Sequence, residues 1–209
     1  MRSIYYGVVR AVDDWIGEIL KKMQGSGILD SALIVFTSDY GEMLGDHGMH
    51  SKVIFYEGSV HVPLRMRFPT AIKLGVVVAE LVSGLDVVAP IFDYPDTPTP
   101  KNNGIGLRPF IEGAQVEHDV VSHSVGRDRP NYMICSGNLK LIMARSTPTK
   151  TINTLYSLQA NPLELPNLIA SPVDPPKNRE QARIIKARLV DWLRRHELHK
   201  VDDLLNVSR

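Results

Sequence analysis

Apolar positions near the start of the chain recur with the period of a helix and then merge into a short continuous run. The side chains at spacings of three and four are Val8, Val12, Trp15, Ile16, Ile19, Leu20 and Met23. They predict an amphipathic helix that ends at Gly25-Ser26-Gly27. Residues 32–37 then form an unbroken apolar run rich in β-formers, which is typical of a strand buried on both faces. Helix, short loop and buried strand together predict an α/β sheet.

The middle of the chain alternates between ordered patterns and loops. Residues 63–68 alternate apolar and basic side chains, which predicts a strand with one wet face. A second helix is expected over residues 76–82. Residues 93–106 are dense in Pro, Asn, Thr and Gly, and are therefore expected to form a loop or linker.

From about residue 116 the pattern indicates a second unit. Residues 132–135 and 139–144 flank Ser136-Gly137-Asn138, which predicts a β-hairpin, and residues 151–158 are a candidate third strand. After a linker at 172–176, residues 178–196 predict a closing helix. Its expected apolar face carries Ile184, Ile185, Leu189, Trp192 and Leu193. We therefore predict two domains, residues 1–115 and a small α+β subdomain at 116–209 with an antiparallel sheet and a C-terminal helix.

Composition excludes some classes of protein. Twenty-four basic and 23 acidic residues give a net charge of +1, which offers no footprint for nucleic acid or for an anionic membrane surface. The single cysteine, Cys135, cannot form an internal disulfide and is expected to be a small buried hydrophobe. We see neither a stretch of about 18 apolar residues nor a secretory signal, so we expect no transmembrane helix; the location stays open, and a cytoplasmic one is favoured.

One loop, residues 38–52, gathers the candidate chemistry. It follows the apolar run of 32–37 and holds two aspartates, a glutamate, two histidines and a lysine, with three glycines that let the backbone turn tightly. In open α/β sheets, ligands bind at this end of the strands. Carboxylates suit calcium or magnesium, histidine suits softer metals, and a lysine can hold an anion. Composition alone favours a solvated loop; the order of the residues shifts the balance towards a site.

That order resembles the sulfatase family of the alkaline phosphatase superfamily. The matching elements are Thr37-Ser38-Asp39, Gly41-Glu42, Leu44-Gly45-Asp46-His47-Gly48, Lys52, Tyr56-Glu57 and Val62-Pro63-Leu64. Further similarities lie in 81–90, in 104–113 and in 155–168, so the resemblance covers nearly the whole chain. It implies that residues 1–115 are the C-terminal part of an α/β/α catalytic sheet, followed by the α+β subdomain.

The resemblance also implies roles for particular residues. Asp39 matches a ligand of a divalent metal, usually calcium. Tyr40 stands where the family commonly has Asn or His; a neutral phenol is a weak ligand, so an aromatic packed over the strand end is the alternative. Lys52 matches the lysine that contacts the sulfate, as a catalytic and substrate-binding residue. His47 is a catalytic candidate near the ester group or else a turn residue, and His50 is expected to line the substrate pocket.

Other polar residues are expected to support the loop or to have no role. Glu42 is interpreted as capping the loop backbone, and Asp46 as pinning the loop. Lys140 is interpreted as a hairpin lysine without a role. His118 and His123 are candidates only for the rim of a pocket.

The implied function is the hydrolysis of sulfate esters, with a set of calcium ligands that is incomplete in this chain. The family's nucleophile is a formylglycine in a Cys/Ser-x-Pro-x-Arg motif, and this motif is missing from the sequence. Cys135, which is followed by Ser-Gly-Asn, is not that residue. The chain alone is therefore expected to be inactive. Alternatives are a phosphonate or phosphodiester hydrolase of the same superfamily, or a non-catalytic fragment that acts as an interaction module. Expected partners are a small-molecule or glycan sulfate ester, with either a missing N-terminal half or a second copy of the chain.

Overall fold

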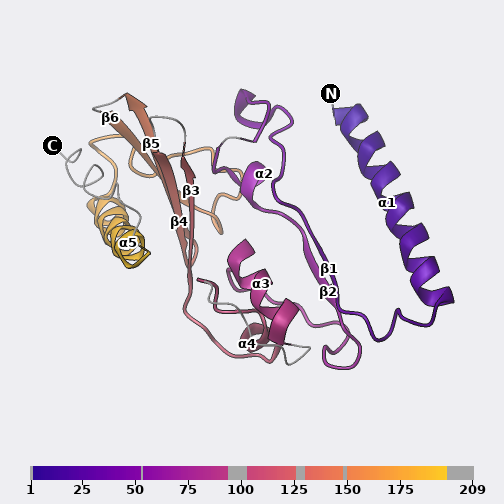
Figure 1. Ribbon diagram of the computed structural model, residues 1–209. Coiled ribbons are helices and arrows are strands. Elements are labelled where there is room, and N and C mark those ends of the chain that lie inside the picture. Colours follow the sequence, from indigo (N-terminus) through magenta and orange to yellow (C-terminus); the bar gives the residue numbers. More distant parts are fainter. Residues whose placement is uncertain (1, 53, 94–102, 126–129, 148–149, 197–209) are drawn as a thin grey trace. The chain divides into compact units, whose positions relative to one another are not determined.

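A computed structural model describes residues 2–52, 54–93, 103–125, 130–147 and 150–196 (Figure 1). The chain divides into two compact units. Unit 1 comprises Met1–Lys52, Gly58–Glu80 and Gly84–Val116. Unit 2 comprises Val53–Glu57, Leu81–Ser83 and Glu117–Arg209. Two short segments from the first half of the sequence thus belong with unit 2. The assignment of residues 1–115 and 116–209 to a catalytic domain and a subdomain stays a prediction.

Unit 1 begins with the predicted amphipathic helix, which is confirmed as α1 (Arg2–Gly25). None of its residues is buried, and several large apolar side chains of α1 are exposed. Among them are Ile4, Tyr6, Val8, Trp15 and Ile19. The spacing of the apolar residues therefore predicted the helix correctly. An apolar stripe of this kind normally packs against a neighbouring element, but the described residues do not bury it.

The strand expected at residues 32–37 is β1 (Ile34–Thr37), and the one expected at 63–68 is β2 (Leu64–Arg67). They pair antiparallel in a two-stranded sheet, with Ile34 opposite Arg67. The prediction that β1 is buried on both faces is wrong, because Phe36 is 42% exposed and Thr37 is also exposed. A two-stranded ribbon lacks the neighbouring strands and covering layers that bury a strand completely.

The helix expected at 76–82 is wrong. Val76, Val77 and Val78 lie in irregular structure after Gly75, and the helix α3 occupies Gly84–Asp93 instead. Consecutive β-branched side chains are stiff and poor helix formers, which accounts for the shift. The loop prediction therefore begins too early at Asp93. Residues 103–106 are irregular as expected, and 94–102 lie outside the described residues.

Three short helical segments complete unit 1 or join it to unit 2. A 3₁₀ turn, η1, covers Asp46–Gly48 inside the candidate loop. Helix α2 (Glu57–Val60) follows that loop, and α4 (Arg108–Ile111) buries Phe110. These turns are too short to show a hydrophobic period, so the sequence pattern did not indicate them.

Unit 2 is built on a four-stranded antiparallel meander in the order β3-β4-β5-β6. The strands are β3 (Asp119–Val125), β4 (Pro130–Ser136), β5 (Leu139–Thr147) and β6 (Lys150–Ser157). The predicted hairpin is confirmed, with Gly137 at φ +54° in the two-residue turn between β4 and β5. The third strand is confirmed as β6. The sequence did not indicate β3, whose apolar valines are interrupted by Ser122, His123 and Ser124.

Helix α5 (Pro176–Arg195) covers one face of this sheet and confirms the predicted closing helix. Its buried side chains are Ala182, Ile185, Leu189, Val190 and Leu193, which pack on Tyr132, Ile134, Leu141, Met143 and Leu155 of the strands. The placement of Ile184 on the apolar face is wrong, because that side chain is 46% exposed. Ile184 lies one residue, or about 100°, away from the buried Ile185.

Residues 167–168 form hydrogen bonds with the outer edge of β6, as a neighbouring strand would. Leu168 N donates a hydrogen bond to Leu155 O at 2.9 Å, and Asn167 Oδ1 accepts one from Leu155 N at 3.0 Å. The side-chain amide of Asn178 donates to Leu168 O at 3.0 Å, which ties this segment to α5. The exposed strand edge is thereby satisfied locally. Within the described part of the chain, no helix has the length and apolar character needed to cross a membrane.

Candidate active-site loop

The loop that follows β1 is fastened by close backbone contact with α2. Gly41 N donates a hydrogen bond to Ser59 O at 2.8 Å. A Cβ atom on Gly41 would lie 2.1 Å from Gly58 O, so no larger residue fits without moving the backbone. The motif glycine at position 41 therefore serves a close approach of two backbone segments.

Two hydrogen bonds hold the other end of the loop. Ser51 N donates to Glu42 Oε1 at 2.6 Å, which confirms the interpretation of Glu42 as a cap for the loop backbone. Ser59, which is 1% exposed, donates through Oγ to Lys52 O at 3.0 Å. Because Gly41 and Lys52 are both tied to residue 59, the loop from 41 to 52 closes on itself and carries Lys52 at its end.

Lys52 lies beside the residue that follows the metal candidate. Its Nζ is 5.3 Å from the centroid of the Tyr40 ring, within the range of a cation–π contact. Tyr40 is 54% exposed, so it is not a fully packed aromatic over the strand end. Asp39 is also exposed and directly precedes Tyr40. Asp39, Tyr40 and Lys52 are thus all exposed, and the ammonium of Lys52 lies over the ring of Tyr40.

The two histidines of the loop take different positions. His47 has φ +54° within η1 and is partly buried, so it occupies a tight turn. His50 is exposed, and its Cε1 would lie 3.7 Å from a Cβ atom on Gly45. Asp46 Oδ1 accepts a hydrogen bond from Arg2 at 2.6 Å on the surface, so it contacts α1. The proposed catalytic part of His47 and the pocket role of His50 stay predictions.

The described residues alone do not make a complete metal site. Within those parts of the chain, no three side chains of His, Cys, Asp or Glu are grouped so that they could hold a metal ion. Calcium takes about six to eight oxygen ligands. Asp39 would supply one or two of these, and Tyr40 is engaged with Lys52. The incomplete set of calcium ligands that the resemblance implies therefore stays a prediction.

Unit 2 contains a buried cluster of three charges that the sequence interpretation missed. Lys140 is 0% exposed, and its Nζ lies 2.8 Å from Glu57 Oε1 and 2.9 Å from Glu164 Oε1. Glu164 is 2% exposed and also accepts a hydrogen bond through Oε2 from Glu57 N at 2.7 Å. The interpretation of Lys140 as a hairpin lysine without a role is therefore wrong. This lysine fixes Glu57 to the face of the sheet opposite α5.

The signal for this cluster was present in the sequence but distributed over it. Glu57 and Glu164 both stand in motifs that carry the family resemblance, whereas Lys140 is an isolated lysine in an apolar strand. An unpaired charge is too costly to bury, so a lysine flanked by Leu139 and Leu141 in an apolar strand indicates carboxylate partners elsewhere in the chain. Glu164 adopts φ +53°, a strained conformation for a residue with a side chain, which the ion pair helps to offset.

Tyr56 and Cys135 lie near the cluster, and the pKa values of both are raised by burial. Burial, followed by the hydroxyl of Tyr156 at 3.5 Å, raises the pKa of Tyr56 well above its ordinary value. Burial likewise raises the pKa of the Cys135 thiol from 9.0 to about 12. Cys135 is thus the inert buried hydrophobe that the sequence predicted, and not a nucleophile.

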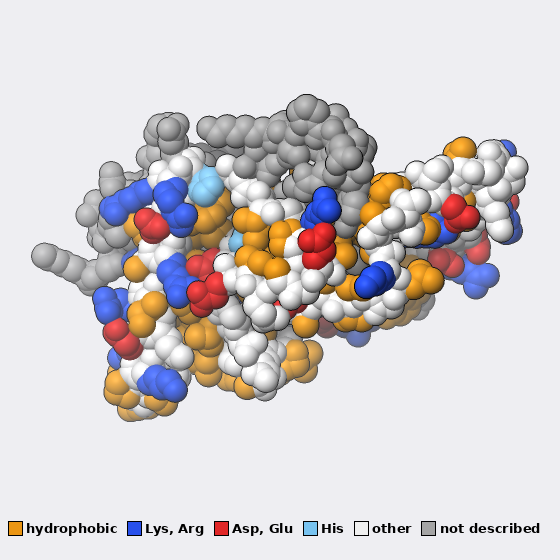
Figure 2. Space-filling model, turned by 90° about the horizontal axis from the view of Figure 1, so that it is seen from below, with side chains coloured by type: hydrophobic (Ala, Val, Ile, Leu, Met, Phe, Trp, Pro, Cys, Tyr) orange, Lys and Arg blue, Asp and Glu red, His pale blue; other side chains and the backbone are white. Residues whose placement is uncertain are grey.

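The remaining polar candidates lie apart from the loop in sequence and belong to unit 2. His118 is partly buried and His123 is exposed, and their proposed place at a pocket rim stays a prediction. Figure 2 shows acidic, basic and hydrophobic side chains interspersed on the face that it draws. This agrees with the net charge of +1.

Comparison with solved structures gives the class of fold. The chain is similar to an enzyme solved in complex with its substrate D-glucosamine-2-N,6-O-disulfate, with a TM-score of 0.82 and 25% identity over 93% of this chain and 40% of that one. It is also similar to the phosphonate monoester hydrolase of Agrobacterium radiobacter, with a TM-score of 0.77 and 27% identity over 93% of this chain and 41% of that one. The fold is therefore the α/β fold of sulfatases and related hydrolases, ending in an α+β part.

The family follows from the sequence comparison. The C-terminal family of N-sulphoglucosamine sulphohydrolase matches residues 45–193, and the chain belongs to this sulfatase family. Choline-sulfatase of Rhizobium meliloti (strain 1021) is 29% identical over 197 residues, which are 91% of this chain and 37% of that enzyme. The chain spans about a third of the length of the curated relatives that it matches.

Proposed function

We propose that this chain supplies the Lys52 loop and the C-terminal subdomain of a hydrolase that cleaves sulfate esters. The observation that carries the proposal is the closed loop in which Lys52 lies beside Tyr40, next to Asp39. The order of residues in this loop is that of the sulfatases, and the relatives are sulfatases by name. The sulfated sugar bound by one structural relative supports a small-molecule or glycan sulfate as the substrate class.

In this proposal each side chain of the loop acts on the substrate or on its neighbours. The ammonium of Lys52 binds a sulfate oxygen and offsets the charge that develops as the ester bond breaks. Tyr40 holds the lysine side chain over its ring, and His50 borders the substrate. His47 fixes the turn and faces the ester group.

Asp39 is proposed as one ligand of a divalent metal, calcium in sulfatases. The described side chains do not complete that site, and in this proposal the other ligands and the nucleophile are supplied from outside the described residues. We therefore expect the chain alone to be inactive.

A chimaera tests the proposal directly. This chain would replace the matching C-terminal segment of the Rhizobium meliloti choline-sulfatase, and turnover of choline sulfate and of 4-nitrophenyl sulfate would be measured with calcium. We expect measurable turnover that falls at least 100-fold in Lys52→Ala and stays within twofold in Lys73→Ala, an exposed lysine of the same unit. Equal losses in the two variants, or no turnover in a chimaera that is folded by circular dichroism, would refute a catalytic role of this loop.

A second candidate is a phosphonate or phosphodiester hydrolase. The specific observation in its favour is the similarity to a phosphonate monoester hydrolase at 27% identity. The same chimaera discriminates between the two, because faster turnover of a phenylphosphonate monoester than of 4-nitrophenyl sulfate would favour the second candidate. A folded chain that binds neither anion would instead favour a non-catalytic interaction module.

A further inference from the structure

The buried charges of unit 2 lie two residues along the chain from the serine that holds the Lys52 loop. Glu57 belongs to unit 2, and Ser59 belongs to unit 1. Ser59 donates a hydrogen bond to Lys52 O at 3.0 Å and accepts one from Gly41 N at 2.8 Å. Helix α2, which contains both Glu57 and Ser59, therefore joins the buried cluster to the two ends of the Lys52 loop through the chain itself.

Glu164 provides the acceptor for the first amide of α2. The first amides of a helix have no acceptor within the helix. Glu57 N, the first of these in α2, donates a hydrogen bond to Glu164 Oε2 at 2.7 Å. A hydrogen bond to a charged acceptor is stronger than one between neutral groups. Because Ser59 lies in the same single turn, this bond also fixes the position of Ser59.

Lys140 holds the two carboxylates of the cluster together. Its Nζ lies 2.8 Å from Glu57 Oε1 and 2.9 Å from Glu164 Oε1. Lys140 and Glu164 are almost completely buried, so water does not compete for these contacts. The neighbouring Tyr56 adds a second anchor, because its ring centroid lies 6.0 Å from that of Tyr156 in β6. The start of α2 is thus held at two successive residues.

We propose that Lys140 and Glu164 are positioning residues for Lys52 and act through Glu57 and α2. In this role neither contacts the substrate, and both fix the turn from which Ser59 binds the backbone of Lys52. The consequence for turnover rests on the proposed function, in which the Lys52 ammonium binds a sulfate oxygen. A loosened loop lowers the fraction of molecules in which that ammonium is in place, and catalysis depends on such placement.

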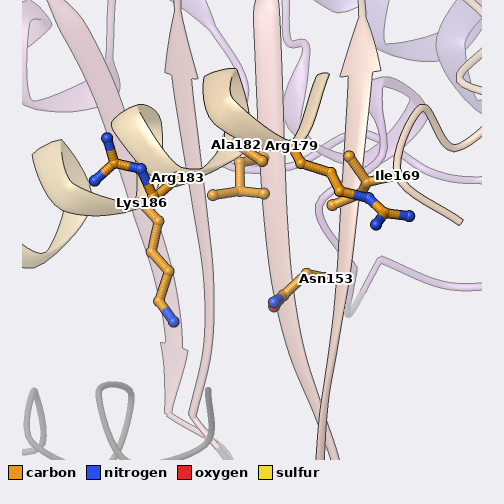
Figure 3. Close-up of a pocket in the computed structure, with 7 residues that line it drawn as sticks. Asn153, Ile169, Arg179, Ala182, Arg183 and Lys186 are labelled. Atoms are coloured by element: carbon orange, nitrogen blue, oxygen red, sulfur yellow. The ribbon is translucent and has the colours of Figure 1, made fainter. Parts of the chain in front are cut away.

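A matched control comes from the opposite face of the same sheet. That face carries α5 and a pocket of about 400 Å³, which is lined by Leu141, Asn153 and residues of α5 (Figure 3). Leu141 directly follows Lys140 in β5, but its buried side chain packs in the core beneath α5. Leu141→Ala should therefore destabilise unit 2 while keeping all three charges of the cluster.

The experiment is amide hydrogen exchange, measured by NMR on the full 209-residue chain and its variants. Glu164→Gly removes the carboxylate at a position with φ +53°, which glycine adopts without strain. The Gly41 and Ser51 amides should then exchange about tenfold faster or more, because a charge-assisted hydrogen bond is lost. Glu164→Gln keeps an acceptor oxygen and should change these rates less than about threefold. Leu141→Ala should quicken exchange in β5 and β6 and leave the two loop amides within about threefold of the parent.

Two further measurements complete the test. The nuclear Overhauser effect between the Lys52 side chain and the Tyr40 ring reports the position of the ammonium, whose Nζ lies 5.3 Å from the ring centroid. It should be lost in Glu164→Gly and persist in Glu164→Gln and Leu141→Ala. Should Glu164→Gly not fold, Glu57→Ala replaces it, because it keeps the hydrogen bond to Glu164 and removes only one partner of Lys140. It should quicken exchange of the loop amides about threefold or more.

Three outcomes would overturn the proposal. The first is unchanged exchange of the loop amides in folded Glu164→Gly, or in Glu57→Ala where that variant replaces it. Equal acceleration in Glu164→Gly and Leu141→Ala would show a general loss of stability, and equal acceleration in Glu164→Gly and Glu164→Gln would show that the bond to Glu57 N does not hold the loop. None of these readings needs turnover, so a chimaera without activity would count against the proposed function and leave them unchanged.

Discussion

Removal of Lys140 should destabilise unit 2 more than the loss of any surface charge. Lys140→Met keeps the apolar stem but leaves Glu57 and Glu164 facing each other without the ammonium, each having been within 2.9 Å of it. Breaking a buried ion pair from one side costs about 3–5 kcal/mol. Glu164 is almost fully buried, whereas Glu57 is 26% exposed and can regain some water, so we expect about 3–4 kcal/mol.

Urea denaturation followed by far-UV circular dichroism measures this loss. With a slope of about 2 kcal/mol per molar, the unfolding midpoint should fall by about 1.5–2 M. The triple variant Lys140→Met/Glu57→Gln/Glu164→Gln removes all three charges and should recover at least half of the loss, because neutral groups of similar shape replace the cluster. Lys177→Met, on the exposed start of α5, should shift the free energy of unfolding by less than about 0.5 kcal/mol. A midpoint of Lys140→Met within 0.3 M of the parent would refute the buried cluster.

Three other changes test different parts of the structure. Gly41→Ala should destabilise the loop by about 1–3 kcal/mol through the clash with Gly58 O, seen as faster amide hydrogen exchange over residues 41–52, whereas Gly17→Ala in the open interior of α1 should not. Leu189→Ala should lower the free energy of unfolding by about 2–5 kcal/mol and Ile184→Ala by less than about 1 kcal/mol; equal losses would mean that α5 is rotated. With a thiol pKa of about 12, Cys135 is roughly one part in ten thousand thiolate at pH 8, so iodoacetamide should label it only after denaturation, and rapid labelling of the native chain would contradict its burial.

Sequence patterns predicted the elements that are long, local and strongly periodic. Helix α1, the hairpin of β4 and β5, and α5 follow from spacing and turn residues that lie close together in the chain. The failures have a common physical origin. The burial of β1 depends on what covers it, and the start of α3 depends on the valines before it being poor helix formers, so neither is fixed by apolar content alone.

In the candidate site, too, the features set by neighbouring residues were predicted and those set by distant residues were not. The order of residues from 37 to 64 located the loop, and the capping role of Glu42 followed from it. In the buried cluster, Lys140 contacts Glu57, which lies more than 80 positions earlier in the chain. Patterns of neighbouring residues therefore did not indicate this contact. The register of β5 places Lys140 opposite Cys135 and Tyr156, so these three residues share one face of the sheet.

Tyr40 shows how a departure from a family pattern can carry information of its own. Tyr40 stands where the family commonly has Asn or His, and a neutral phenol binds calcium more poorly than those residues do. In the structure its ring lies 5.3 Å from Lys52 Nζ, where a cation–π contact contributes about 0.5–1 kcal/mol at an exposed site. That energy is small compared with the entropy that a lysine side chain loses when it is fixed, so the contact biases the ammonium towards the Tyr40 ring without holding it there. The residue that is a poor metal ligand at position 40 thus supplies an aromatic contact for the cation at position 52.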